Sequence, residues 1–297
     1  MKQVASLRYG VIFKKAFSQP DIFTAFVQDV LGVHVEIDRV ETEKSFKPLV
    51  GYVDSRFDLF AQDDKNRIIV DIQHVQNEDH YDRFLHYHCV ALLEQIANAK
   101  NYRPALKVFT IVVLTSGDRH QKDVLTIDFD PKDLQGNGIH EIPHKVIYLS
   151  PKYVNDNTPA AYKEWLDAIQ DTLDEEVDES HYHNAIIQRI FTVIQKDGIT
   201  PTERYEMIEE YNRREFLEKE RAIAEKERAR AEEAELEIAK AKLETEQARL
   251  ESENAKLQAA NARSEIVKNM LAIGLSIETI SQTTGLTHAE VESLNTP

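Results

Sequence analysis

FDLFAQDDKNRIIVDIQ, residues 57–73, contains two apolar runs separated by a polar, turn-like tetrad at 63–66. The runs Phe57–Phe60 and Ile69–Gln73 have the composition of β-strands. A hairpin whose tip is the tetrad places Asp58 directly opposite Asp71. Gln73 lies two residues beyond Asp71 and therefore points to the same face of its strand.

Two carboxylates in this register form either a metal site or an ordinary polar pair. Opposite residues in a sheet have Cβ atoms roughly 4.5–5.5 Å apart, and like charges at that distance are destabilising. A hard divalent cation would relieve the repulsion between Asp58 and Asp71, since Mg²⁺ is commonly held by one or two carboxylates and substrate oxygens. The alternative is that both aspartates are simple polar residues on an exposed strand face.

The flanking pattern predicts an α/β domain. Apolar residues at helical spacing over 12–31, interrupted by Pro20, indicate two helices. Residues 80–102 indicate one long helix that carries Arg83 and Tyr87 on one face, four residues apart. Further strands are predicted at 108–115, 124–129 and 145–149, of which the first is apolar throughout and suits the centre of a sheet.

Composition excludes several classes of protein. The 297 residues contain one cysteine, so no intramolecular disulfide can form. The chain lacks a run of the roughly 18 apolar residues that a membrane span needs, and its N-terminus is not that of a signal peptide, so we expect a cytoplasmic protein with no membrane partner. The nine glycines form no phosphate-binding loop, and the histidines at 74, 80, 86 and 88 lack zinc-ligand spacing.

Net charge does not exclude DNA as a partner. The chain carries a formal net charge of −16, but residues 164–212 alone hold 13 acidic and 3 basic residues. The acidity is therefore concentrated in a middle helical segment and not in the region of the aspartates.

The C-terminal part is predicted to be helical. Residues 213–263 are rich in Glu, Lys, Arg and Ala, and leucines recur every seven residues at 236, 243, 250 and 257. The companion core positions are polar (Lys240, Gln247 and Asn254), which predicts a weak parallel coiled coil or a solvated spacer helix. Residues 264–297 predict three short helices, at 266–273, 277–283 and 287–294. Their outline is that of a helix-turn-helix, but the last helix has no Lys or Arg for DNA contacts.

The ordered set of motifs resembles the recombination-promoting nuclease (Rpn) and transposase family of the PD-(D/E)XK superfamily. The motifs are Phe13-Lys14-Lys15-Ala16-Phe17, Phe57-Asp58, Asp71-Ile72-Gln73, Arg83 with Tyr87, and Tyr102. The resemblance implies a mixed β-sheet flanked by helices, as in restriction endonucleases. It covers most of residues 8–150.

The same resemblance assigns roles by position. It implies metal ligation by Asp58, Asp71 and the Ile72 carbonyl, and a catalytic set of Asp58, Asp71, Gln73, Arg83 and Tyr87. Gln73 stands at the place of the superfamily lysine. Gly10 stands where many members carry an acidic residue. The implied cofactor is Mg²⁺, with Mn²⁺ as an alternative.

The domain division expected is 1–163 nuclease-like, 164–212 acidic and helical, 213–263 long charged helix, and 264–297 small helical unit. The function predicted is a Mg²⁺-dependent DNA endonuclease, linked to recombination, transposition or phage defence and acting as a homodimer. Two alternatives remain open: a nuclease fold that has lost activity and serves as an interaction module, and a purely structural coiled-coil adaptor.

Overall fold

The computed structural model describes residues 1–46, 55–74, 80–96 and 102–294. The chain divides into two compact units, Met1–Phe216 and Leu217–Pro297. Residues 97–101, which fall within the long helix predicted at 80–102, lie outside the described residues.

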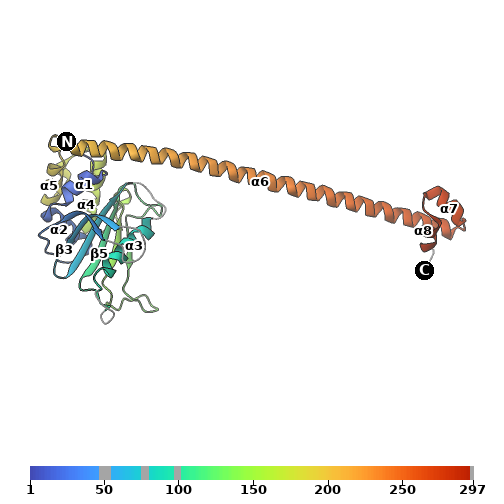
Figure 1. The fold of residues 1–297 in the computed structure, drawn as a ribbon, viewed down its shortest axis with the longest axis horizontal. Helices are drawn as coiled ribbons and strands as arrows, with labels where there is room; N and C mark the ends of the chain where they lie inside the picture. Colours follow the sequence, from blue (N-terminus) through green and yellow to red (C-terminus); the bar gives the residue numbers. More distant parts are fainter. Residues whose placement is uncertain (47–54, 75–79, 97–101, 295–297) are drawn as a thin grey trace. The chain divides into compact units, whose positions relative to one another are not determined.

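A mixed six-stranded sheet forms the centre of the first unit (Figure 1). Its spatial order is β2-β3-β4-β5-β7-β6. The β4, β5 and β7 strands run parallel, and the pairs on either side of them are antiparallel. The bounds are β2 Glu41–Phe46, β3 Ser55–Gln62, β4 Asn66–Gln73, β5 Lys107–Leu114, β6 Val124–Asp128 and β7 Lys145–Leu149. The predicted mixed sheet and its five predicted strands are confirmed, whereas β2 was not predicted from the sequence.

The β3–β4 hairpin has the predicted register from its tip to the Leu59–Val70 pair, but the ladder does not extend to the predicted pair of Asp58 and Asp71. Gln62 pairs with Arg67 and Leu59 pairs with Val70, so the tip is the tetrad at 63–66. Asp63 fixes this turn, because its Oδ1 accepts hydrogen bonds from the backbone N–H groups of Lys65 at 2.8 Å and Asn66 at 2.6 Å. An aspartate that bonds to the backbone two and three residues ahead is a common way to close a turn.

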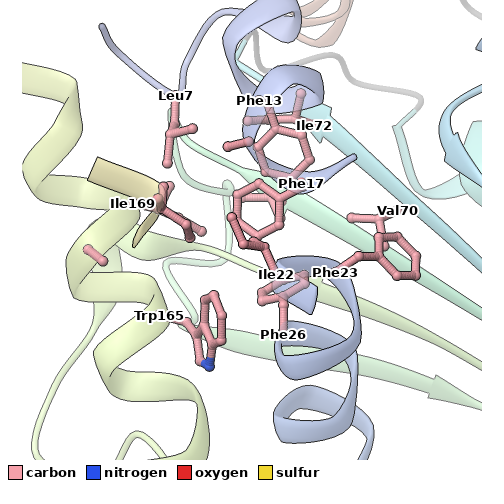
Figure 2. Close-up of a cluster of buried hydrophobic side chains, with 14 of the residues drawn as sticks. Leu7, Phe13, Phe17, Ile22, Phe23, Phe26, Val70, Ile72, Trp165 and Ile169 are labelled. Carbon is pink, nitrogen blue, oxygen red and sulfur yellow. The ribbon is translucent and has the colours of Figure 1, made fainter. Parts of the chain in front are cut away.

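One face of the sheet is covered by α1 (Gly10–Phe17), α2 (Pro20–Leu31), α4 (Ala160–Asp171) and α5 (Ala185–Val193). Pro20 begins α2 at the first helical position and so ends the preceding helix, as predicted. Figure 2 shows Phe17 and Phe26 beside Trp165 of α4, with Val70 and Ile72 of β4 in the same cluster. The indole N–H of Trp165 donates to Asp29 Oδ2 at 2.6 Å, which satisfies its polar atom inside the core.

The opposite face is covered by α3, which spans His80–Leu93. The prediction of a single helix over 80–102 was therefore wrong at its C-terminal end. Arg67 of β4 explains the stop, because its guanidinium donates to the Ala91 carbonyl at 3.0 Å and to Glu94 Oε2 at 2.6 Å. A cation at the last carbonyls stabilises a helix end, and this one comes from a distant strand.

Small elements complete the first unit. The β1 strand, Lys2–Gln3, pairs antiparallel with β8, Glu176–Val177. Val177 of β8 is buried in the core although acidic residues surround it in the sequence. Four 3₁₀ turns lie at Pro151–Tyr153, Thr172–Asp174, Glu179–His181 and Lys196–Gly198.

One continuous helix, α6, runs from Pro201 to Ala272. It begins in the first unit and ends in the second, and the segment predicted as a separate helix at 266–273 is instead its last two turns. No Gly or Pro interrupts it until Gly274, which adopts a φ of 84°. The α7 helix, Ile277–Thr284, and α8, His288–Ser293, then begin at the predicted caps Ser276 and Thr287. Val267, Ile280 and Val291 form their small core.

Candidate active site

Asp58 and Asp71 meet where the β3–β4 ladder opens. The last paired residues are Leu59 and Val70. Beyond them, the Ile72 N–H donates to Asp58 Oδ2 at 3.0 Å and the Asp58 N–H donates to Asp71 Oδ2 at 3.4 Å. Each carboxylate therefore accepts a main-chain N–H from the neighbouring strand, and the two side chains are held together by the strands that carry them.

The regular alternation of β3 breaks at Asp58. Phe57 packs with the α3 cluster and Leu59 with the α1–α2 cluster, although residues two apart normally share a face. On the neighbouring strand β2, the register Thr42–Leu59 and Lys44–Phe57 puts Glu43 opposite Asp58. Glu43 has a φ of 55°, in the left-handed region that glutamate rarely adopts. Such backbone strain is frequent at functional sites.

Burial makes this carboxylate pair costly. Asp71 is 2% exposed, and burial raises its pKa well above the usual value, with the charge of Asp58 raising it further. Burial also raises the pKa of Asp58, although the Ile72 N–H and the Lys14 ammonium oppose this. Two acids that both resist ionisation at close range are typical of sites that bind a cation or move protons.

Gln73 orients one of these carboxylates. Its Nε2 donates to Asp71 Oδ1 at 2.7 Å, so the two side chains lie close together, as predicted. The next residue, His74, contacts Thr115 through Nδ1 and Oγ1 at 2.8 Å. Burial, together with the charges of Arg214 and Arg8, lowers the pKa of His74 to about 4, so this imidazole is neutral near pH 7.

Arg83 and Tyr87 meet on α3, as their spacing predicts. Arg83 Nε donates to the Tyr87 hydroxyl at 3.2 Å, and the Tyr87 ring packs edge-on against Phe57 at 5.4 Å between centroids. Burial disfavours the charged form of Arg83, but the Tyr87 hydroxyl and the charges of Asp71 and Asp58 outweigh it and raise the pKa of Arg83. The guanidinium therefore lies within the electrostatic field of both aspartates.

The structure also brings in residues that the sequence did not single out as part of the site. Lys14 forms an ion pair with Glu43, and its charge lowers the pKa of Asp58. Glu210 of α6 accepts a hydrogen bond from the Gly10 N–H at 2.9 Å, and its carboxylate oxygen lies 3.8 Å from where a Cβ of residue 10 would stand. Position 10 itself has no acidic side chain, but Glu210, which lies 200 residues later in the chain, places a carboxylate beside it.

Two other residues of interest lie apart from the aspartate pair. Tyr102, part of the ordered motif set, is 73% exposed. His88 is buried on α3, where its Nδ1 lies 3.0 Å from Thr110 Oγ1 and its ring stacks on Phe129. His88 therefore packs α3 against β5 and the segment that carries Phe129.

The donor set at the aspartate pair suits a hard cation. Among the described residues, no three His, Cys, Asp or Glu side chains are grouped to hold a metal ion. A Mg²⁺ site does not require three, because this ion keeps several waters and binds through one or two carboxylates. The buried Asp71 carboxylate and its neighbour Asp58 offer oxygen ligands whose repulsion a divalent cation would relieve, so the residues present fit such an ion.

A mixed sheet flanked by helices, with two aspartates at the open end of a hairpin, defines a fold of the PD-(D/E)XK nuclease class. The family model described as PD-(D/E)XK nuclease family transposase matches residues 9–226. The chain belongs to this family, as its motifs led us to expect. No curated protein and no solved structure matched the chain. Within the described part of the chain, no helix is both long and apolar enough to cross a membrane.

Proposed function

We propose that the protein is a Mg²⁺-dependent DNA endonuclease that hydrolyses phosphodiester bonds, with Mn²⁺ as an alternative ion. The observation that carries this proposal is the hydrogen-bonded pair of Asp58 and Asp71, whose raised pKa values reflect burial and mutual repulsion. A pair of this kind weakens the fold unless a cation or substrate compensates for it. The family supports nuclease chemistry as the use of that pair.

The residues around the pair have complementary roles. Asp58, Asp71 and the Ile72 carbonyl would hold the ion, which supplies Lewis acidity and neutralises charge on the phosphate. Gln73 would orient the attacking water through its side-chain amide. Arg83, held by Tyr87, would donate to a phosphate oxygen as charge accumulates there. The water oxygen forms a bond to phosphorus, and one phosphorus–oxygen ester bond breaks. The attacking water loses a proton, and the leaving oxygen gains one to become an alcohol.

Plasmid cleavage with purified protein tests the proposal. We expect wild-type protein to nick and linearise DNA in Mg²⁺ and to be inactive with a chelator. Asp58→Ala should lower the rate by at least about 100-fold, since removal of one ligand disrupts both ion binding and phosphate placement. Asp64→Ala is the matched control, because Asp64 is exposed at the tip of the same hairpin. An Asp58→Ala protein that cuts as fast as wild type would refute the proposed site.

The partners that we propose are DNA and a second copy of the chain. The leucines at 236, 243, 250 and 257 are all about half exposed or more in the single chain, and they follow one another at heptad spacing. A parallel two-stranded coiled coil would cover them. A dimer would also supply two sites, one for each DNA strand, which suits a role in recombination, transposition or phage defence.

The same leucine stripe favours a second candidate function. A nuclease fold that has lost activity could serve as an interaction module that dimerises through α6. Titration calorimetry separates the two candidates. Mg²⁺ or Mn²⁺ binding that disappears in Asp71→Ala supports the nuclease, whereas a wild-type protein that binds neither ion supports the interaction module.

A further inference from the structure

Two consecutive lysines on α1 have similar burial but different surroundings. The side chains of Lys14 and Lys15 are each 22% exposed. Lys15 forms an ion pair with Glu203 Oε2 at 2.9 Å and donates to the Gly198 carbonyl at 2.8 Å, so it joins α1 to the start of α6. Lys14 instead forms its ion pair with Glu43, the residue opposite Asp58 in the sheet register.

The charge of Lys14 acts on several carboxylates at once. It lowers the pKa of Asp58 against the effect of burial, and it acts in the same direction on Glu43 and Glu210. Arg83, on α3, acts on Asp58 and Asp71 from the other face of the sheet. The aspartate pair is therefore flanked by one cation from each helical layer.

Glu43 is the carboxylate partner of Lys14, and a bound anion could replace it. Its two carboxylate oxygens contact Lys14 and Arg56, respectively, and its φ of 55° turns the strand at this residue. A carboxylate shared between a lysine and an arginine resembles a phosphate diester in charge and in its hydrogen-bonding oxygens. A phosphate oxygen could therefore take the place of the Glu43 carboxylate as the partner of the Lys14 ammonium.

Gln73 cannot supply a positive charge to the site, whereas Lys14 can. Gln73 follows the second aspartate and is already engaged with Asp71 Oδ1, and its amide carries no charge. We infer that Lys14 is a second cationic catalytic residue of this site besides Arg83, contacting a non-bridging oxygen of the scissile phosphate, and that Glu43 holds its ammonium in place in the free protein. This inference rests on the proposed nuclease function and adds to it a residue from α1.

The test compares Lys14→Gln, Lys14→Arg and Lys15→Gln in the full-length protein. Single-turnover cleavage at saturating DNA should fall about 100-fold in Lys14→Gln, the usual loss when one donor to a transition-state oxyanion is removed. Lys14→Arg should recover part of the rate, because it restores the charge. Lys15→Gln should cleave within about threefold of wild type, because its ion pair is structural and partly exposed.

Mg²⁺ titration separates loss of chemistry from collapse of the site. Lys14→Gln should bind Mg²⁺ as tightly as wild type or more tightly, since a positive charge beside Asp58 has been removed. Wild-type cleavage by Lys14→Gln, loss of its Mg²⁺ binding, or equal impairment of Lys14→Gln and Lys15→Gln would each overturn the inference while leaving the nuclease proposal intact. A wild-type protein that cleaves no DNA would overturn both, and that result does not depend on any Lys14 variant.

Discussion

At the scale of single residues, Asp71 is a buried carboxylate with a second carboxylate beside it. It lies on a buried strand, is 2% exposed, and has Asp58 as its neighbour. A buried carboxylate is tolerated only when it is hydrogen-bonded or paired with a cation. Asp71 is hydrogen-bonded to Gln73 and to the Asp58 N–H, but its opposite charges are provided only by groups farther away.

Replacing Asp71 by asparagine should therefore stabilise the protein in the absence of divalent ions. Asparagine keeps the shape and one acceptor oxygen but removes the charge whose burial raises the pKa of Asp71, so the free energy of unfolding should increase. This gain should raise Tm by a few degrees, roughly 2–4 °C for each kcal/mol in a domain of this length. Thermal melts at pH 7.5 with a chelator measure the effect.

Added Mg²⁺ should reverse the order of the two proteins. A ligand that binds only the folded state raises the free energy of unfolding by an amount that grows with the ratio of ligand concentration to Kd, so wild type should gain stability and Asp71→Asn should not. An Asp71→Asn protein that melts below wild type in the chelator would show that Asp71 is a structural hydrogen-bonding residue and not a strained ligand. Asp64→Asn, at the exposed hairpin tip, is the control for loss of one negative charge.

The aspartate pair could be predicted from sequence because its geometry is local. Two short apolar runs and one polar tetrad fix the hairpin register as far as the Leu59–Val70 pair, which brings Asp58 and Asp71 to the same end of the hairpin. Lys14, Glu43 and Glu210 could not be found in this way, since each comes from a different element and joins the site only through tertiary packing. The left-handed φ of Glu43 had no signal in the sequence, because no glycine or asparagine marks it.

At the scale of elements, the hydrophobic pattern predicted the existence of α3 but not the residue at which it ends. Its apolar spacing and the contact between Arg83 and Tyr87 were predictable from helical periodicity. Its end at Leu93 was not, because the Arg67 side chain that binds the Ala91 carbonyl belongs to β4. For helix α6, the sequence pattern suggested boundaries that the structure does not have. Pattern changes near 212 and 263 suggested divisions, but nothing at these positions stops a helix, and the main chain continues to Ala272.

His88 couples the packing of α3 to pH. Burial, together with the nearby charge of His144, lowers the pKa of His88 to about 3 in the folded protein, against about 6.5 in an unfolded chain. Because unfolding then takes up a proton, stability is complete above pH 6.5 and falls as pH drops from 6.5 towards 3. This one group should cost about 2 kcal/mol between pH 7 and pH 5.

Urea unfolding of His88→Phe at pH 7 and pH 5 checks this prediction. Phenylalanine preserves the stacking on Phe129 but loses the contact with Thr110, so it should be less stable than wild type at pH 7 and should lose less stability on acidification. His86→Phe, on an exposed position of the same helix, should retain the wild-type pH dependence. Equal pH dependence in His88→Phe and wild type would assign the acid sensitivity to other groups.

At the scale of the whole molecule, α6 links the family-matched region to the exposed leucine stripe. The family match ends at residue 226, and the stripe begins at Leu236. The start of α6 is held in the first unit by the Lys15–Glu203 pair and by the hydrogen bond from Gly10 to Glu210. Self-association along the stripe would therefore act on a helix whose first turns contact the surroundings of the candidate site.

Leu243→Asp should abolish self-association. Sedimentation at micromolar concentration should show wild type as a dimer and the variant as a monomer, because a charge at a core position of a weak coiled coil removes its main apolar contact. Ile238→Asp is the matched control, because Ile238 is equally apolar and 56% exposed but lies off the stripe. Plasmid assays should then show nicking without efficient linearisation by the Leu243→Asp protein. A wild-type monomer would exclude the coiled coil.

The position of Asp71 on β4 has one more consequence. Strand β4 lies between β3 and β5, with Ile68, Val70 and Ile72 packed on one face and Ile69 on the other. Amides in such a strand open to solvent only in the rarest fluctuations of a domain, whereas peripheral segments open often. Asp71 therefore lies on an inner strand, where we expect slower amide exchange than in the peripheral strands, so opening of those strands would leave Asp71 in place.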